Sequence, residues 1–133
     1  MTADIETCLQ ILQSAAMAIF LEERKRDPLR NTNRVRAYVM TVLAKDHRCP
    51  LADEVAHKMA MSDPTLRRHL CQEGSSFQRI IDDVRCEFAK GLLLKGLSID
   101  DIADDLGFSA SSGFSRAFSQ WTGKPPSTWR NAA

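Results

Sequence analysis

The chain has 133 residues, enough for one ordinary domain or for two small helical units that share a connector. Its hydrophobic residues (44%) and charged residues (26%) are typical of a globular protein and exclude a disordered or a membrane-spanning chain. The net charge is only +1, but residues 24–36 hold six basic side chains against Asp27 alone, whereas residues 100–105 hold four aspartates. A nearly neutral chain of this kind can still present one basic surface.

The N-terminus and the cysteines indicate a reducing compartment. MTADIETC is acidic where a secretory signal is basic, and the apolar run at 14–21 is too short to span a bilayer, so we expect a cytoplasmic protein with no membrane partner. Cys8, Cys49, Cys71 and Cys86 lack C-x-x-C spacing, and the histidines form no ligand pattern. We therefore predict four free, core-packing thiols, no metal site and no cofactor.

Apolar residues at three- and four-residue steps predict helices along the first half of the chain. The first two dozen residues form one amphipathic pattern that ends near residues 27–28, and a second helix covers 32–45, with Asn31 or Thr32 as its cap. The N-terminal pattern fits a dimer seam, a docking helix or the tail of a sensing domain equally well. After Pro50 the next helix carries an apolar stripe made of Leu51, Val55, Ala56 and Met59.

The second half continues the helical pattern. Ser62 begins a helix at about 63–72 that Gly74 ends, and Ser76 begins the longest run, of about 19 residues or about 28 Å, which closes at residues 95–96. Ser98 caps the next helix, Gly107 makes a turn, and a further helix starts at about Ser109. Pro125 and Pro126 stop that helix, and Ser127 is predicted to cap a last turn. No strand pattern occurs, so the fold class is all-α.

Two segments of the chain repeat one pattern. EVAHKMA at 54–60 matches DIADDLG at 101–107, and LRRHL at 66–70 matches FSRAF at 114–118. Helix, short turn and second helix is the helix-turn-helix arrangement, whose second helix enters the major groove of DNA. A connector of about 28 Å together with the width of its flanking helices can separate two such helices by about 34 Å, the distance between successive major grooves on one side of the duplex.

Residues 51–130 resemble the DNA-binding domain of AraC/XylS-type bacterial transcription regulators. IADDLGFSASSGFSRAFSQWTGKPPSTWR at 102–130 agrees with the family pattern I-A-x-x-x-G-F-x-x-x-x-x-F-x-R-x-F-x-x-x-x-G-x-x-P-x-x-x-R at every defined position. With the helix at 32–45, the resemblance covers about three quarters of the chain. It implies seven helices in two subdomains, an asymmetric DNA site and contact with RNA polymerase.

The resemblance also implies which residues read bases. They fall at Asp63, Pro64, Arg67 and Arg68 in the first reading helix and at Ser111, Ser112, Ser115 and Arg116 in the second. Arg67 is the best candidate, because a guanidinium can donate two hydrogen bonds to guanine. The sequence departs from the family pattern at Ala60, where the turn usually has glycine, and at Pro64, where a larger contacting side chain is common.

The predicted organisation is an N-terminal helix (1–28), a first helix-turn-helix subdomain (29–76), a connecting helix (77–96) and a second subdomain (97–133). Phosphate contacts are expected from Arg30, Arg34, Arg36, Arg79, Lys90 and Lys124. Asp104 and Asp105 are candidates for facing RNA polymerase, and self-association would use the N-terminal helix or a further domain. The alternative is a helical protein-interaction module that reads no DNA. An enzyme is not expected, because no nucleophile, base or phosphate loop accompanies the carboxylates.

Overall fold

The computed structural model describes residues 28–132, and these are helical with no strand. Its contacts separate residues 1–30 from residues 31–133, and the helix predicted at 1–28 lies almost entirely outside the described residues. The helices are α2 (Arg30–Asp46), α3 (Ala52–Lys58), α4 (Asp63–Gln72), α5 (Phe77–Leu94), α6 (Ile99–Asp105), α7 (Ser111–Thr122) and α8 (Pro126–Ala132). The predicted all-α class is confirmed.

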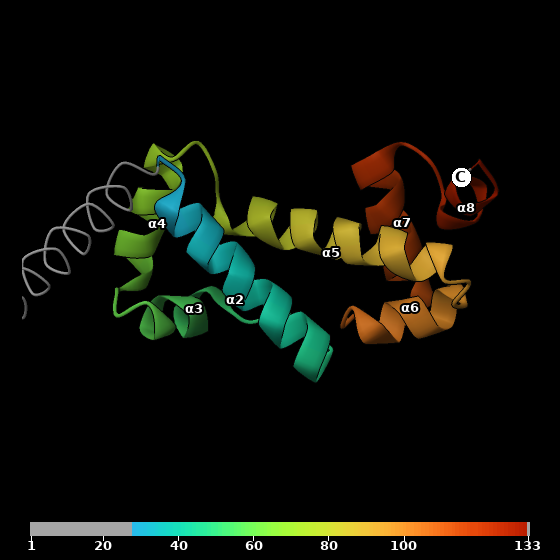
Figure 1. Ribbon diagram of the computed structural model, residues 1–133, viewed down its shortest axis with the longest axis horizontal. Coiled ribbons are helices and arrows are strands. Elements are labelled where there is room, and N and C mark those ends of the chain that lie inside the picture. Colours follow the sequence, from blue (N-terminus) through green and yellow to red (C-terminus); the bar gives the residue numbers. More distant parts are fainter. Residues whose placement is uncertain (1–27, 133) are drawn as a thin grey trace, which may run out of the picture. The chain divides into compact units, whose positions relative to one another are not determined.

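The longest helix, α5, connects two helix-turn-helix units. Figure 1 shows α2, α3 and α4 around its beginning and α6, α7 and α8 around its end. The 18 residues of α5 make it about 27 Å long. The predicted arrangement of two units on one long helix is therefore confirmed.

A continuous hydrophobic core runs through both units. Leu66 and Leu70 of α4, and Phe114 and Phe118 of α7, are completely buried, as the repeat predicts. Among the described residues of the predicted apolar stripes, Leu51 is the exception, because it is 71% exposed. It precedes the first turn of α3 instead of lying on the buried stripe, so that part of the prediction was wrong.

Three serines cap their helices, and the caps at Ser62 and Ser98 were predicted. The side chains of Ser62, Ser76 and Ser98 each accept a hydrogen bond from a backbone amide in the first turn of α4, α5 and α6, respectively. These caps satisfy amides that have no partner within the helix and fix where each helix begins.

Other predicted helix starts were wrong by one or two residues. α2 begins at Arg30, so Asn31 and Thr32 lie inside it; the Thr32 amide donates instead to Glu73 Oε1 at 2.8 Å, which connects α2 to the end of α4. α7 begins at Ser111 behind Ala110, which provides no side-chain cap, and not at Ser109. α8 begins at Pro126, because proline fits a first helical turn, so Ser127 does not cap it.

Candidate nucleic-acid interface

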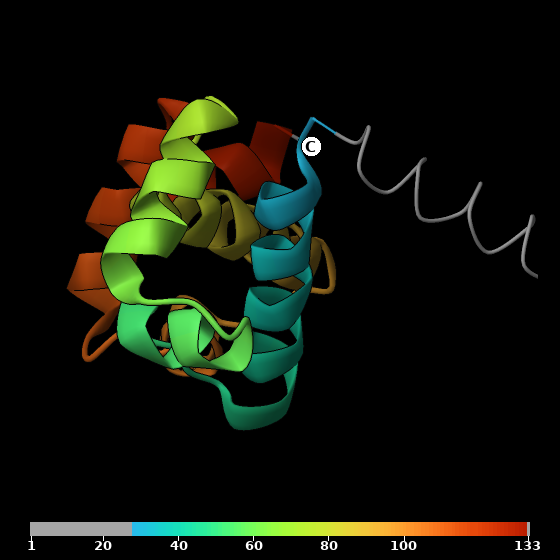
Figure 2. The same ribbon diagram turned by 90° about the vertical axis from the view of Figure 1, so that its left-hand side faces the viewer.

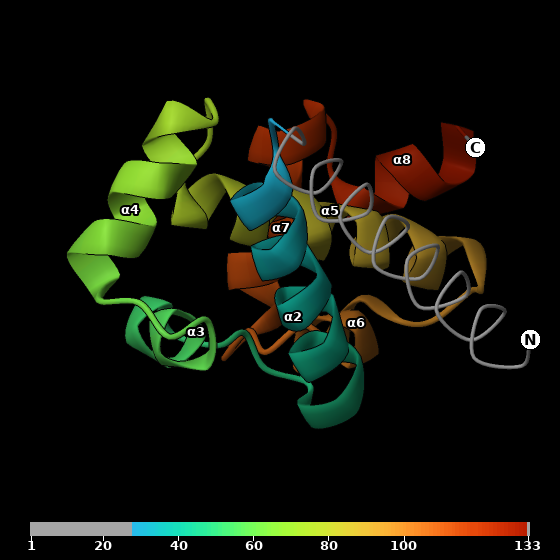
Figure 3. The same cartoon turned by 60° about the vertical axis from the view of Figure 1, so that its left-hand side comes forward.

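The second helices of the two units, α4 and α7, lie on the same side of α5. Both run in the same direction, from bottom to top in Figure 1 and in the turned views of Figures 2 and 3. Figure 2 looks toward the α3–α4 end and shows α4 and α7 together on the left, with α2 on the other side. One straight DNA duplex can therefore face both helices.

The turn that aims each of these helices has a left-handed backbone. Ala60 has φ 56° and Gly107, its equivalent in the repeat, has φ 81°. Ala60, which stands where the family usually has glycine, thus adopts the left-handed conformation that glycine favours. Each turn is closed by a backbone hydrogen bond to the alanine that both copies of the repeat share, from Met61 N to Ala56 O at 2.9 Å and from Phe108 N to Ala103 O at 2.9 Å.

Helix α4 exposes both of its arginines. Arg67 Nε donates to Asp63 Oδ1 at 3.1 Å, and the two side chains are 68% and 31% exposed, respectively. Arg68 is exposed, and within residues 28–132 it makes no ion pair that would compete with a ligand. Pro64 is also exposed, in the first turn of the helix. The four predicted base-reading positions of α4 thus all lie outside the core.

A hollow of about 460 Å³ lies beside α4. It is lined by Arg67 and Cys71 and by residues 75–78, which include the start of α5. Cys71 is exposed here, so its prediction as a core-packing residue was wrong. Cys49 and Cys86 are half-buried free thiols, and Cys8 lies outside the described residues.

Helix α7 presents a smaller polar surface. Ser112 and Arg116 are exposed and one turn apart, whereas Ser111 and Ser115 are half-buried. Phe114 and Phe118 hold the opposite side of the helix in the core. Arg116 is therefore the strongest hydrogen-bond donor among the predicted base-reading side chains of α7.

The predicted phosphate-binding residues fall into two groups. Arg30, Arg34, Arg79 and Lys124 are exposed. Arg36 is half-buried, with its guanidinium 3.6 Å from Asp83 Oδ2 on α5, and Lys90 Nζ lies 3.7 Å from Glu87 Oε1. A phosphate would have to compete with these two carboxylates.

Two charged residues have partners that the sequence did not reveal. Arg130, the last residue of the signature, donates from its guanidinium to the backbone carbonyl of Leu97, which fastens α8 to the turn between α5 and α6. Asp105 Oδ1 lies 3.8 Å from His47 Nδ1, whereas Asp104 is exposed. Of the two aspartates predicted to face RNA polymerase, Asp104 is therefore the more accessible.

Two helix-turn-helix units carried by one helix define a class of DNA-binding domain. A family model described as a helix-turn-helix domain matches residues 55–132. The ornithine utilization regulator of Pseudomonas aeruginosa is 41% identical over 92 residues, which are 68% of this chain and 27% of that protein. The chain belongs to the AraC/XylS-type family of helix-turn-helix transcription regulators, as its signature predicted.

Solved structures show the same arrangement. The C-terminal domain of AraT, a response regulator from Geobacillus stearothermophilus, is 30% identical with a TM-score of 0.68, over 77% of this chain and 85% of that one. The DNA-binding domain of AdpA, a global transcriptional factor solved in complex with a target DNA, is 28% identical with a TM-score of 0.64, over 80% and 92%.

The chain spans about a quarter of the length of the first curated relatives that it matches. Within residues 28–132 no helix is both long enough and apolar enough to cross a membrane.

Proposed function

We propose that residues 30–132 bind double-stranded DNA sequence-specifically, as the DNA-binding part of a transcription regulator. The observation that carries this proposal is the placement of α4 and α7, which run in the same direction on one side of α5 and expose Arg67, Arg68 and Arg116. With α5 about 27 Å long, the two helices enter successive major grooves, which lie about 34 Å apart on one face of the duplex.

The two reading helices make different contributions. In α4, Arg67 and Arg68 donate to guanine or to phosphate, Asp63 orients Arg67 or accepts from cytosine, and Pro64 offers only an apolar contact. In α7, Arg116 is the main donor. Ser111, Ser112 and Ser115 offer short hydrogen bonds that either base or phosphate can satisfy, so α7 positions the domain more than it selects sequence.

The ion pair between Asp63 and Arg67 prepares Arg67 for this role. The carboxylate occupies Nε, while the two terminal nitrogens of the guanidinium are the ones that pair with the O6 and N7 atoms of guanine. The pair is exposed, so water screens it and it adds little to stability. Its consequence is orientation of the planar group along α4.

The test begins with selection of bound sequences from a random DNA pool, which yields the preferred site. Fluorescence anisotropy then compares this site with random duplexes for the parent chain and for Arg67→Ala. Loss of one bidentate base contact costs about 1–3 kcal/mol, so the ratio of the two affinities falls by about 5- to 150-fold. Lys45→Ala, an exposed cation at the end of α2, removes the same charge and keeps the ratio. An Arg67→Ala chain that discriminates as well as the parent contradicts the assignment.

Phosphate contacts have a separate signature, the salt dependence of binding. Each phosphate contact contributes about 0.9 to the slope of log affinity against log salt. Arg79→Ala and Lys124→Ala each weaken all duplexes alike and lower the slope by about 1. Arg34→Ala decides whether α2, which lies on the other side of α5 from the reading helices in Figure 2, also reaches the backbone. An unchanged slope removes the residue concerned from the phosphate set.

Further partners belong to the same proposal. RNA polymerase is the proposed protein partner, with Asp104 as the exposed acidic candidate on α6. Bacterial DNA lies in the cytoplasm, so the regulator works there. Self-association is assigned to segments outside residues 30–132. A helical protein-interaction module replaces the DNA-binding proposal if no duplex in the pool is retained at low salt.

A further inference from the structure

The two helix-turn-helix units also touch each other directly, beside the connecting helix α5. The turn between α2 and α3, at 47–49, meets the end of α6 and its following turn, at 105–108. Arg85 of α5 lies beside both segments. We call residues 47–49, Arg85 and residues 105–108 the junction.

The closest approach in the junction is between two backbones. A Cβ atom placed on Gly107 would lie 3.1 Å from Arg48 Cα and 3.2 Å from His47 O. Both distances are shorter than ordinary carbon contacts, and both neighbours are backbone atoms that cannot rotate away. A side chain at this position therefore forces the two turns apart by a few tenths of an ångström.

Side chains reinforce the same contact. His47 Nδ1 lies 3.8 Å from Asp105 Oδ1, and the Arg85 guanidinium carbon lies 4.3 Å from the centroid of the Phe108 ring. Burial raises the pKa of the Cys49 thiol, and the charge and hydrogen bonding of Arg85 partly offset that increase. Arg85 thus interacts with Cys49 from the first unit and Phe108 from the second.

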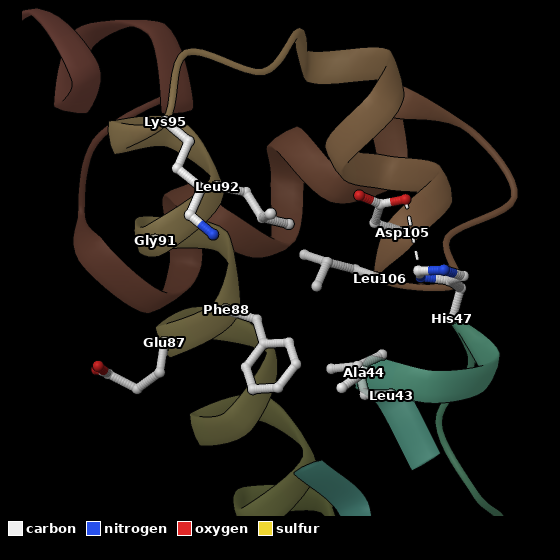
Figure 4. Close-up of a pocket in the computed structure, with 10 residues that line it drawn as sticks. All are labelled: Leu43, Ala44, His47, Glu87, Phe88, Gly91, Leu92, Lys95, Asp105 and Leu106. Atoms are coloured by element: carbon white, nitrogen blue, oxygen red, sulfur yellow. Dashed lines mark ion pairs between the residues drawn. The ribbon is translucent and has the colours of Figure 1, made fainter. Parts of the chain in front are cut away.

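Beside the junction the two units are separated by a groove of about 490 Å³. Figure 4 shows Phe88 and Leu92 of α5 facing this space from one side and Leu43 of α2 and Leu106 from the other, with the pair of His47 and Asp105 at one edge. The groove means that α2 and α6 do not pack closely across this region. The junction is one place where the second unit bears directly on the first.

The equivalent turn of the first unit shows that Gly107 is not required by its φ alone. Ala60 adopts φ 56° in the matching turn and is exposed. An L-residue is thus accepted in this backbone conformation where space is open, at a cost of about 1–2 kcal/mol. At Gly107 the added constraint is the approach of residues 47 and 48.

We propose that the junction fixes the separation and mutual rotation of α4 and α7, and so determines which spacing between two half-sites the domain accepts. This inference rests on the proposed DNA-binding function. Gly107, Arg85 and Phe108 are then positioning residues for recognition, although they do not touch DNA. Because one base pair shifts a groove by about 3.4 Å and about a tenth of a turn, a small rotation between the units changes the preferred spacing.

The test compares Gly107→Ala with Gly96→Ala in the full chain. Gly96 has φ 85° and no atom within 4 Å of an added Cβ, so both substitutions strain the backbone while only Gly107→Ala pushes the units apart. Arg85→Met is the second junction variant, in case Gly107→Ala does not fold. Circular dichroism and thermal melting establish folding.

The first measurement uses the selected duplex and versions with one base pair removed or added between half-sites. The parent loses about tenfold in affinity for the altered spacings, a cost comparable to that of one mismatched base pair. In Gly107→Ala and Arg85→Met the ratio of the affinity for the selected spacing to that for an altered spacing falls to about threefold or inverts. Gly96→Ala keeps the parent ratio. Folded junction variants with the parent ratio, or a Gly96→Ala chain that also loses it, overturn the inference.

The second measurement needs no DNA and so separates this inference from the proposed function. Residual dipolar couplings report the orientation of the α3–α4 pair relative to the α6–α7 pair in each chain. The junction variants change this orientation and Gly96→Ala does not. If the parent chain prefers no duplex, both the proposed sequence-specific DNA binding and the proposed role in half-site spacing are wrong. If the couplings are unchanged in both junction variants, only the positioning role of the junction is wrong.

Discussion

Replacement of Ala60 by glycine is expected to stabilise the domain. Ala60 lies in the turn between α3 and α4 with φ 56°, a left-handed conformation in which Cβ crowds the following carbonyl. Its side chain is exposed, so its removal sacrifices no core packing. The backbone bonds of the turn, from Ala60 N to His57 O at 3.0 Å and from Met61 N to Ala56 O at 2.9 Å, remain available to glycine.

The magnitude follows from two opposing terms. Relief of the left-handed strain contributes about 1–2 kcal/mol. Glycine makes the unfolded chain more flexible and subtracts about 0.4–1 kcal/mol. The net increase in the free energy of unfolding is between about 0 and 1.6 kcal/mol, with a middle value of about 0.8 kcal/mol. In a domain of this size 1 kcal/mol corresponds to roughly 4–8 °C, so the middle value raises the melting temperature by about 3–6 °C.

Thermal melting followed by circular dichroism measures this shift, with urea unfolding as the equilibrium check. Ala37→Gly is the matched control, since Ala37 is exposed in the middle of α2, where glycine costs about 1 kcal/mol relative to alanine. The two substitutions are chemically identical and have opposite expected signs. A fall in melting temperature for Ala60→Gly similar to that for Ala37→Gly would refute the assignment of strain to this turn.

Three further predictions concern individual side chains. Arg130→Met leaves the Leu97 carbonyl without its donor and lowers the free energy of unfolding by about 1–3 kcal/mol, whereas Lys124→Met, at an exposed site, changes it little in the same urea titration. Iodoacetamide near pH 8 modifies exposed Cys71 before Cys49 and Cys86, because burial raises the pKa of the latter two thiols; peptide mapping that shows equal rates would contradict their burial. The hydrogen bond from Arg48 lowers the pKa of Glu54, so the stability that this pair contributes is present above the unfolded pKa and is lost as the pH falls through the folded pKa. Glu54→Gln should therefore flatten the decline in melting temperature between about pH 5 and pH 3. An unaltered decline would exclude the pair as its source.

The parts of the fold that local chemistry controls could be predicted from the sequence. Serine caps at Ser62, Ser76 and Ser98 and apolar spacing around Leu66 and Phe114 depend on residues within a few positions of each other. The errors arose where a nearby residue could replace the expected one. Pro126 starts α8 without a serine cap, and Leu51 lies on the predicted stripe but precedes the helix that would have turned it inward.

The candidate site could be predicted only as a set of positions. The repeat placed Arg67, Arg68 and Arg116 on second helices, and their exposure agrees with that placement. It did not reveal that Asp63 holds Arg67 or that Asp83 pairs with Arg36. Asp83 lies 47 positions after Arg36, so only the folded arrangement of α2 and α5 brings the two charges together.

Gly107 shows why the contact between the two units could not be predicted from the sequence. In the aligned turn Ala60 also has a positive φ, as Gly107 does. A positive φ therefore explains a preference for glycine at this position but not a requirement for it. The additional reason is the distance of 3.1 Å to Arg48 Cα, across 59 positions of chain. One glycine thus serves two levels of structure, since it shapes its own turn and lets that turn approach the other unit. A repeat in the sequence describes each unit, whereas the places where the two copies differ identify the contact between them.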